Sequence, residues 1–216
     1  MSYASLIMGY SGSGKTTSLR NLDPATSFLI CVIRKPLPFK GWREKWREVS
    51  KDRKGGNMLV SDSASEIRKY MKGISDSYPH IKTIIIDDSQ YIMANEFMRS
   101  INEKGYDKFN RIGKDFWDIA TDAANLRSDL NVILLQHEET NDLGSTKAKT
   151  IGKMLDDKIT LEGMFTIVLR AAKRDGKHVF LTKNSGFDTV KAPDGMFNDS
   201  EIDNDINLVL NAINTY

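Results

Sequence analysis

The chain has little of the residues that mark several specialised protein classes. Of its 216 residues one is a cysteine, five are prolines and 9% are aromatic. The single Cys31 excludes an intramolecular disulfide framework, and its apolar neighbours predict a buried thiol in a reducing compartment. The sequence also lacks an 18-residue apolar run and a recognisable secretory signal. These absences favour a cytoplasmic protein that does not bind membranes.

Net charge is nearly absent as well. Lysine and arginine number 31 and aspartate and glutamate 29, which leaves a net charge of +2. This total says nothing about nucleic acid, but residues 40–54 hold seven basic and three acidic side chains. Trp42, Trp46 and Val49 follow one helical face of this basic insertion, which spans about 40–56. Two interpretations stay open: a surface helix docked on the core, or a basic and aromatic face for DNA or a partner protein.

The length and the 40% apolar content predict a single domain over residues 1–216. Its pattern is α/β, because apolar runs typical of buried strands alternate with helical patterns, and this predicts a mostly parallel central sheet flanked by helices. Strands are expected at 6–8, 27–33, 57–60, 82–86 and 131–135, and helices at 17–22, 63–74, 94–101 and 109–123.

The second half of the chain departs from this alternation. Residues 165–172 and 177–182 surround an Asp-Gly pair and predict a β-hairpin. Residues 200–203 resemble a capping box, so they are expected to begin a C-terminal helix. The polar stretch 138–163 is predicted to be a mobile loop, because a loop of that length in a compact domain is usually functional.

One motif carries the strongest functional signal. Residues 9–16, GYSGSGKT, match G-x-x-x-x-G-K-[ST], with a strand predicted before them and a helix after them. Glycines allow successive backbone N–H groups to turn inward around a phosphate, Lys15 can reach the outer phosphates, and the Thr16 hydroxyl can ligate Mg²⁺. The residues predicted to bind the nucleotide are Gly9, Tyr10, Ser11, Gly12, Ser13, Gly14, Lys15, Thr16 and Thr17.

Polar residues that end two predicted strands complete this site. Asp87 closes the strand at 82–86 and is expected to hold Mg²⁺, because ligands of parallel sheets bind at the carboxyl ends of strands. Asp88 either polarises the attacking water or is an exposed acid or helix cap, with Glu96 as a second candidate. Gln136 either senses the γ-phosphate or is an ordinary polar strand end.

Hydrolysis at such a site needs a further cation on the transferred phosphate, often from a neighbouring subunit. Four basic residues lie in or beside the predicted hairpin, and Lys183 and Lys191 are the favoured pair. The other two are Arg170 and Arg174. His137 with its neighbouring glutamates does not indicate zinc, because no further ligand completes the pattern.

GYSGSGKTT, TIIIDDSQ, LLQHEE and the late FLTKNSGFDTVKAPDGMF resemble the AAA-type P-loop ATPases with a RecA-like core that are common in bacteriophages. The resemblance implies a RecA-like sheet, bound MgATP, a homo-oligomer with ATP between subunits, and a role with single-stranded DNA in recombination or annealing. It assigns roles to Gly9, Gly12, Gly14, Lys15, Thr16, Asp87 and Gln136. Many RecA-core members have a catalytic glutamate after the second strand, where this chain has Arg34 and Lys35.

Three functions are consistent with these observations. The first is an Mg²⁺-dependent ATPase of phage-type DNA metabolism, whose rate is low if the absent glutamate is not replaced. The second is an ATP-gated adaptor with little hydrolysis. The third is a small P-loop kinase, which the absence of arginine from residues 138–163 disfavours.

Overall fold

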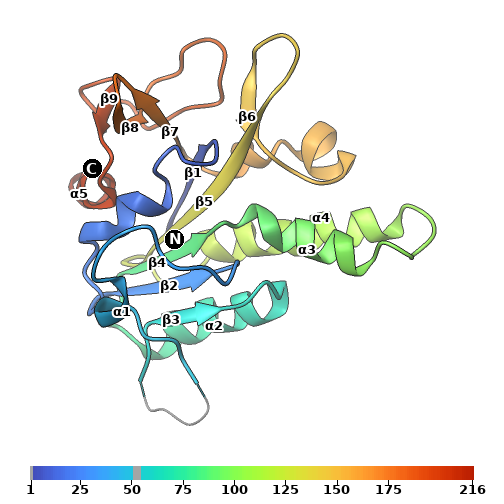
Figure 1. Ribbon diagram of the computed structural model, residues 1–216, viewed down its shortest axis with the longest axis horizontal. Helices are drawn as coiled ribbons and strands as arrows, with labels where there is room; N and C mark the ends of the chain where they lie inside the picture. The colour runs from blue at the N-terminus through green and yellow to red at the C-terminus, as the bar shows by residue number, and fades with distance from the viewer. Residues whose placement is uncertain (1, 51–54) are drawn as a thin grey trace.

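The computed structural model describes residues 2–50 and 55–216. Strands form one sheet in the order β3-β2-β4-β5-β1-β7-β8-β9, with β6 paired to β5 (Figure 1). The pairs among β1, β2, β3, β4, β5 and β7 are parallel, whereas β6, β8 and β9 are antiparallel to their partners. The strands are β1 Tyr3–Gly9, β2 Ser27–Cys31, β3 Met58–Val60, β4 Thr83–Asp87, β5 Asn131–Thr140, β6 Thr146–Ala148, β7 Ile167–Arg174, β8 Lys177–Leu181 and β9 Glu201–Asp203.

Helices lie on both faces of the sheet, as predicted for an α/β protein. They are η1 Thr16–Asn21, α1 Trp42–Lys45, α2 Ala64–Ser77, α3 Gln90–Arg99, α4 Asp107–Ala124, η2 Met154–Ile159, η3 Leu161–Met164 and α5 Ile206–Thr215. The predicted N-cap is confirmed, since the Ser63 side chain accepts a hydrogen bond from the Glu66 backbone amide. The reciprocal bond of a capping box is not formed, because the Ser63 amide donates to the Ser61 hydroxyl, which in turn donates to the Glu66 carboxylate. α3 and α4 form a long pair that projects from the sheet (Figure 1).

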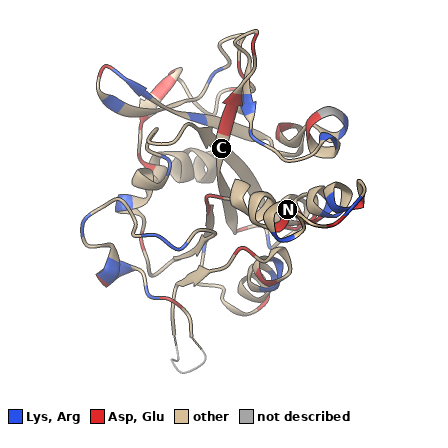
Figure 2. Cartoon of the chain, turned by 45° about the vertical axis from the view of Figure 1, so that its right-hand side comes forward, with Lys and Arg blue, Asp and Glu red and all other residues tan. Residues whose placement is uncertain are grey.

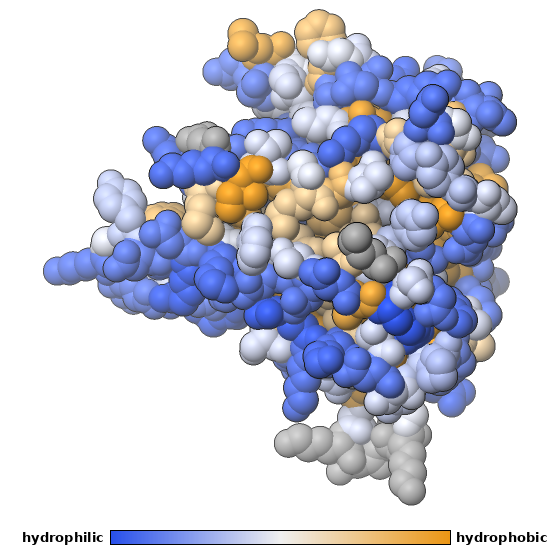
Figure 3. Space-filling view, turned by 180° about the vertical axis from the view of Figure 1, so that it is seen from behind, coloured by the Kyte–Doolittle hydropathy of each residue, from blue (hydrophilic) through white to orange (hydrophobic). Residues whose placement is uncertain are grey.

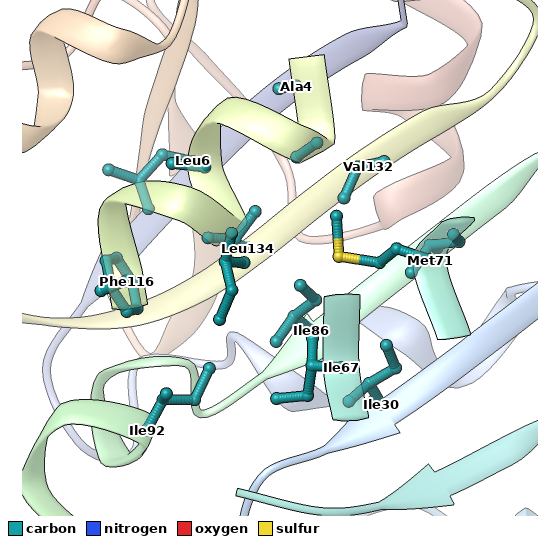
Figure 4. Packing of buried hydrophobic residues seen from close by; sticks show 14 of the residues in the cluster. Ala4, Leu6, Ile30, Ile67, Met71, Ile86, Ile92, Phe116, Val132 and Leu134 are labelled. Carbon is teal, nitrogen blue, oxygen red and sulfur yellow. The ribbon is translucent and has the colours of Figure 1, made fainter. Parts of the chain in front are cut away.

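Alternating side chains of the strands build two apolar layers. Leu6, Ile86 and Leu134 point to one face and pack with Phe116 of α4 and Met71 of α2 (Figure 4). The residues between them in sequence, such as Ile7 and Leu135, face the other layer with α5 and η1. Burial on both faces explains why these strands are apolar at nearly every position, which is the pattern that predicted a parallel sheet.

The hairpin β7–β8 is confirmed, but the C-terminal helix begins later than predicted. Asp175 and Gly176 form the two-residue turn, both with positive φ, which suits the twist of a hairpin. Residues 201–203 form β9 on the edge of β8, so they cannot start a helix. The Asp205 side chain caps α5 instead, by accepting from the Asn207 amide at 3.0 Å.

The helix predicted over the basic insertion is wrong for most of its length. α1 covers four residues, and the chain then pairs with β3 through the Glu48 and Met58 bridge. Trp46 is 2% exposed and packs in the core, so its interpretation as a DNA-stacking side chain is wrong. Trp42 is partly buried, with Arg43 over its ring at 5.2 Å. Residues 51–54 of the insertion, three of which are basic, lie outside the described residues.

The stretch 138–163 also holds more structure than the predicted loop. β5 continues to Thr140 and pairs with β6, and two short helical segments, η2 and η3, follow. Leu155 and Leu161 from these segments are buried in the layer that contains α4. The polar composition concealed this, because few apolar residues anchor the segment.

Candidate functional site

β1 ends in the loop of residues 9–16, hereafter the glycine loop. Gly12 and Gly14 have φ of 78° and 98°, in the left-handed region that residues with a Cβ rarely adopt. A Cβ on Gly9 would lie 2.6 Å from the Ala171 carbonyl oxygen, and one on Gly14 would lie 2.9 Å from His178 Cγ. The glycines therefore meet a conformational and a steric requirement of the loop.

Polar groups of the glycine loop are left without partners. Among the described residues, the backbone amides of Gly12, Gly14 and Lys15 make no hydrogen bond, and of these three residues Gly14 and Lys15 are buried while Gly12 is exposed. The buried Ser13 hydroxyl likewise has none there. Buried polar groups are normally paired, and groups that are not often mark a binding site. Several unpaired donors in one turn suit an anionic ligand.

Helical structure after the glycine loop is as short as predicted but more tightly wound than an α-helix. η1 is a 3₁₀-helix of six residues, and the Ser18 hydroxyl donates to the Lys15 carbonyl oxygen at 2.6 Å. The Ser18 amide is shared between the carbonyl oxygens of Gly14 and Lys15, at 2.9 and 3.3 Å. These bonds to the i−3 carbonyl compete with α-helical bonds and tighten the turn.

Lys15 bends back over the glycine loop. Its Nζ donates to the carbonyl oxygens of Gly9 at 2.6 Å and Tyr10 at 2.8 Å, and the residue is 5% exposed. Burial lowers the pKa of Lys15 to about 8, against the opposing effect of the nearby carboxylates of Asp88 and Asp87. An anion at this position would replace the two carbonyl oxygens as partners of the ammonium group.

Thr16 and Asp87 are in contact at the carboxyl ends of the parallel strands. The Thr16 hydroxyl donates to the two Asp87 oxygens at 2.8 and 3.0 Å. Asp87 is the last residue of β4 and is 2% exposed, and burial together with the Asp88 charge raises its pKa. The sequence prediction that these two residues share a site agrees with this geometry.

Asp88 lies beside Asp87 but has different partners. It is 3% exposed, which rules out the exposed acid, and α3 has Ser89 at its N-cap position. Lys35 forms an ion pair with Asp88, and His137 Nε2 lies 3.6 Å from it. Burial alone would raise the pKa of Asp88, but these two neighbours lower it below its usual range. Asp88 also has a φ of 60°, which is rare for a residue with a side chain.

A cavity of about 760 Å³ opens in front of these groups. Its walls come from the glycine loop, the segment after β2, the start of α3 and the end of β5. The lining residues are Tyr10, Ser11, Gly12, Gly14, Lys15, Thr16, Thr17, Lys35, Pro36, Pro38, Asp88, Gln90, Tyr91, His137, Glu138, Glu139 and Lys149.

Gln136 does not line this cavity. The strand β5 does lie next to β4, as the prediction required, but side chains alternate along it, and His137, opposite Gly9, faces the cavity instead. Gln136 is fully buried, accepts from the Ser89 hydroxyl at 3.0 Å and donates to the Lys149 carbonyl oxygen at 2.8 Å. It therefore joins α3 to the segment after β6.

None of the four predicted cations lines the cavity. Lys183 and Lys191 are exposed, and Lys183 donates to the Asn198 carbonyl oxygen at 2.7 Å. Arg174 pairs with Glu201 at the hairpin end. Arg170 lies closest, since it makes two hydrogen bonds to the buried Glu138, at 2.7 and 2.8 Å, behind the glycine loop.

Sequence reasoning missed nine residues that line the cavity, among them Lys35, His137 and Glu138. The signal for the last two was present, because both follow the buried run of β5 directly. Lys35 gave a weaker signal, since it lies four residues beyond the end of β2. Glu96 is away from the cavity and instead pairs with Arg99 and Arg111 on the α3–α4 pair.

Within the described residues, no cluster of three or more histidine, cysteine, aspartate or glutamate side chains is placed to hold a metal. None of the helices there combines the length and apolar character needed to cross a membrane. No protein-family model matches the chain, and no curated protein matches it significantly.

Proposed function

We propose that the chain binds MgATP at the glycine loop and hydrolyses it. The observation that carries the proposal is the set of unpaired donors in one turn, the amides of Gly12, Gly14 and Lys15 and the Ser13 hydroxyl, at the end of a parallel strand. Three amides and an ammonium group match the oxygens of a polyphosphate. The cavity of about 760 Å³ is large enough for a nucleotide.

The oxygen donors near the glycine loop suit Mg²⁺. Thr16 and Asp87 supply a hydroxyl and a carboxylate that already lie 2.8 Å apart, and hard oxygen ligands are those that Mg²⁺ prefers. Because Mg²⁺ usually keeps several waters and binds through few protein ligands, two residues and the phosphate oxygens make a sufficient site. When bound, the ion neutralises charge on the phosphates.

The strand order supports a RecA-like arrangement. In the order β2-β4-β5-β1-β7, one strand separates the glycine-loop strand from the Asp87 strand, and all five are parallel. Ligands of open α/β sheets bind at the carboxyl ends of their strands, where the glycine loop, Asp87 and His137 lie. The fold and the site therefore favour the same ligand class.

In this proposal each residue has one task. The glycine-loop amides bind the β- and γ-phosphates. Lys15 leaves the Gly9 and Tyr10 carbonyl oxygens and contacts the outer phosphates. Thr16 and Asp87 would hold Mg²⁺. Asp88 orients the attacking water. Catalysis of phosphoryl transfer consists mainly of such positioning and charge stabilisation.

The proposed partnership with single-stranded DNA rests on the family resemblance. The face formed by Trp42 and Trp46 no longer supports it, because Trp46 is in the core. Basic and acidic residues are mixed along the helices (Figure 2). The proposal that DNA binds here predicts a rise in phosphate release when single-stranded DNA is added at low salt. Equal rates with and without DNA at every salt concentration would contradict it.

The experiment on nucleotide binding uses isothermal calorimetry with MgATP, MgADP and MgAMP. Wild type is expected to bind the first two, and Lys15→Ala is expected to weaken MgATP at least about 100-fold, since a lost charge-assisted contact to phosphate costs several kcal/mol. Lys149→Ala, on the rim of the same cavity, serves as the matched control and should bind within about threefold of wild type. Unchanged affinity in Lys15→Ala would contradict the proposal.

An ATP-gated switch is the second candidate, and one observation favours it. Asp88, the proposed water-orienting carboxylate, is already engaged by Lys35 and has a lowered pKa, which makes it a weak proton acceptor. A switch would change its oligomeric state with MgATP and release no phosphate. Sizing chromatography beside a phosphate assay separates the two functions.

A further inference from the structure

We propose that Lys35 is the cation that contacts the transferred γ-phosphate, supplied by the same chain that binds the nucleotide. The inference rests on the proposed function, and it offers an alternative to the Lys183 and Lys191 pair, whose charge was expected to come from a neighbouring subunit. It starts from the ion pair between Lys35 and the buried Asp88, two residues that both line the cavity.

Strand pairing places Lys35 at the site. β2 and β4 are adjacent and parallel, with Cys31 opposite Asp87. Beyond Cys31 the chain continues past the edge of the sheet, and the Val32 amide donates to the Asp87 carbonyl oxygen at 3.1 Å. This bond fixes the direction of the segment, so that the Lys35 side chain, three residues later, reaches Asp88.

The exposures of the two partners show which one faces the cavity. The Lys35 side chain is 45% exposed and the Asp88 side chain is 4% exposed. The carboxylate therefore lies behind, and the ammonium group lies between it and the open cavity that both line. A lysine on a flexible four-carbon stem can turn from one anion to another without movement of the backbone.

Charge favours that exchange once a triphosphate is bound. The γ-phosphate carries more negative charge than one carboxylate, and a cation on its oxygens is most valuable when the charge spreads over them in the transition state. Lys15, which in the proposed function moves from the Gly9 and Tyr10 carbonyl oxygens to the outer phosphates, approaches them from the glycine loop. Lys35 approaches from the opposite wall, beside Asp88.

The same exchange frees Asp88 for the water. As the water oxygen bonds to the γ-phosphorus, the bond from that phosphorus to the β–γ bridging oxygen breaks, and ADP leaves with its electron pair. One proton of the water passes to Asp88, whose partner Lys35 has moved to the phosphate, and is then lost to solvent. The residues that deliver charge and accept the proton are thus paired before the nucleotide arrives.

The decisive variant is Lys35→Met, which keeps the length of the stem and removes the charge. Its matched control is Arg34→Met, which removes a neighbouring cation that pairs with Glu48 outside the cavity. Lys149→Met tests the third cavity lysine as the competing candidate for the same role. The readouts are the dissociation constants of MgADP and of MgADP with aluminium fluoride, a mimic of the transition state, together with phosphate release.

Lys35→Met is expected to bind MgADP within about threefold of wild type, to lose about 100-fold in affinity for the aluminium fluoride complex, and to lose a similar factor in phosphate release. Arg34→Met should match wild type in all three. Lys35→Arg should recover most of the aluminium fluoride affinity, and its recovery should not depend on protein concentration, because the cation acts within one chain.

Three results would overturn the inference: unchanged aluminium fluoride affinity in Lys35→Met, an equal loss for MgADP alone, or a loss in Lys149→Met instead. Thermal melting of each variant shows whether the fold is intact. Failure of the proposed function is distinguishable from these results, because wild type would then bind neither MgADP nor its aluminium fluoride complex.

Discussion

Gly14 allows His178 to pack closely against the glycine loop. Its φ is 98°, and His178 of β8 packs where a Cβ would lie, while His178 Nδ1 is 3.1 Å from the Ser13 carbonyl oxygen. Gly12 has a similar φ of 78° but faces open space. The two glycines therefore differ in steric environment and share the conformational requirement.

Gly14→Ala is predicted to destabilise the protein more than Gly12→Ala. Both changes force a residue with a Cβ into the left-handed region, at about 1–2 kcal/mol, and Gly14→Ala adds a clash with His178. Urea unfolding of the two variants measures the difference. The added loss should shrink in Gly14→Ala combined with His178→Ala, and equal losses for Gly12→Ala and Gly14→Ala would contradict this reading of the contact.

Among the helices, α5 depends on the N-cap residue Asp205. Its side chain accepts from the Asn207 amide and from Asn21 Nδ2, at 3.0 and 2.6 Å, so it also ties α5 to η1. Asp205→Ala is predicted to cost about 1 kcal/mol in the free energy of unfolding. Ser200→Ala is the control, since the cap predicted there is absent, and a larger loss in the control would show that the helix starts earlier.

Asp62 couples α2 to α3 in a pH-dependent way. Partial burial would raise the pKa of Asp62, but hydrogen bonds from Arg99 and Asn95 outweigh this and lower it. A lowered native pKa adds stability above the unfolded pKa of about 4, and that stability is lost as the pH falls through the native value.

Asp62→Asn is therefore predicted to be less stable than wild type at pH 7, with a difference that narrows towards pH 2.5. Urea midpoints at the two pH values test this. Asp76→Asn, which changes an exposed aspartate near the end of α2, is the control. A constant difference between Asp62→Asn and wild type at both pH values would exclude the linkage.

Helices and strands with a periodic buried face could be predicted from the sequence. Segments whose conformation depends on pairing with a distant strand could not. β2, β4 and β5 are apolar at successive positions, and α4 repeats Ile112, Phe116 and Ile119 on its buried side. The stretch after Trp42 has a helical pattern as well, but its pairing with β3 outweighs that preference.

The candidate site likewise contains residues that the sequence could predict and residues that it could not. The glycine loop and Asp87 follow from motif and spacing, because a strand end and its next residues are adjacent in sequence. Lys35 comes to Asp88 through the pairing of β2 with β4, which no local pattern contains. Gln136 and His137 are one residue apart, so the choice between them depends on the side of β5 that faces the cavity.

In the molecule as a whole, the glycine loop contacts a strand pair that extends away from the main sheet. This pair is the end of β5 with β6 (Figure 1), and the Tyr10 hydroxyl contacts Thr140 of β5. From behind, hydrophilic residues cover most of the surface, while apolar side chains gather in a central hollow (Figure 3). The contact between Tyr10 and Thr140 thus links the glycine loop to the β5–β6 pair.

Lys183 and Lys191, exposed in this region, remain candidates for contacts between subunits. If the chain assembles with nucleotide, sizing chromatography should show a larger species with MgATP than with MgADP, and Lys183→Ala with Lys191→Ala should reduce it. Retention of the monomer size at all concentrations would argue against assembly.

The glycine loop is proposed to bind a magnesium-bound triphosphate, and calorimetric titration of native wild-type protein with MgATP is the simplest test. One saturable site per chain is expected, and Lys15→Ala is expected to lose it. Absence of binding to folded wild type, or equal binding by Lys15→Ala, would contradict it.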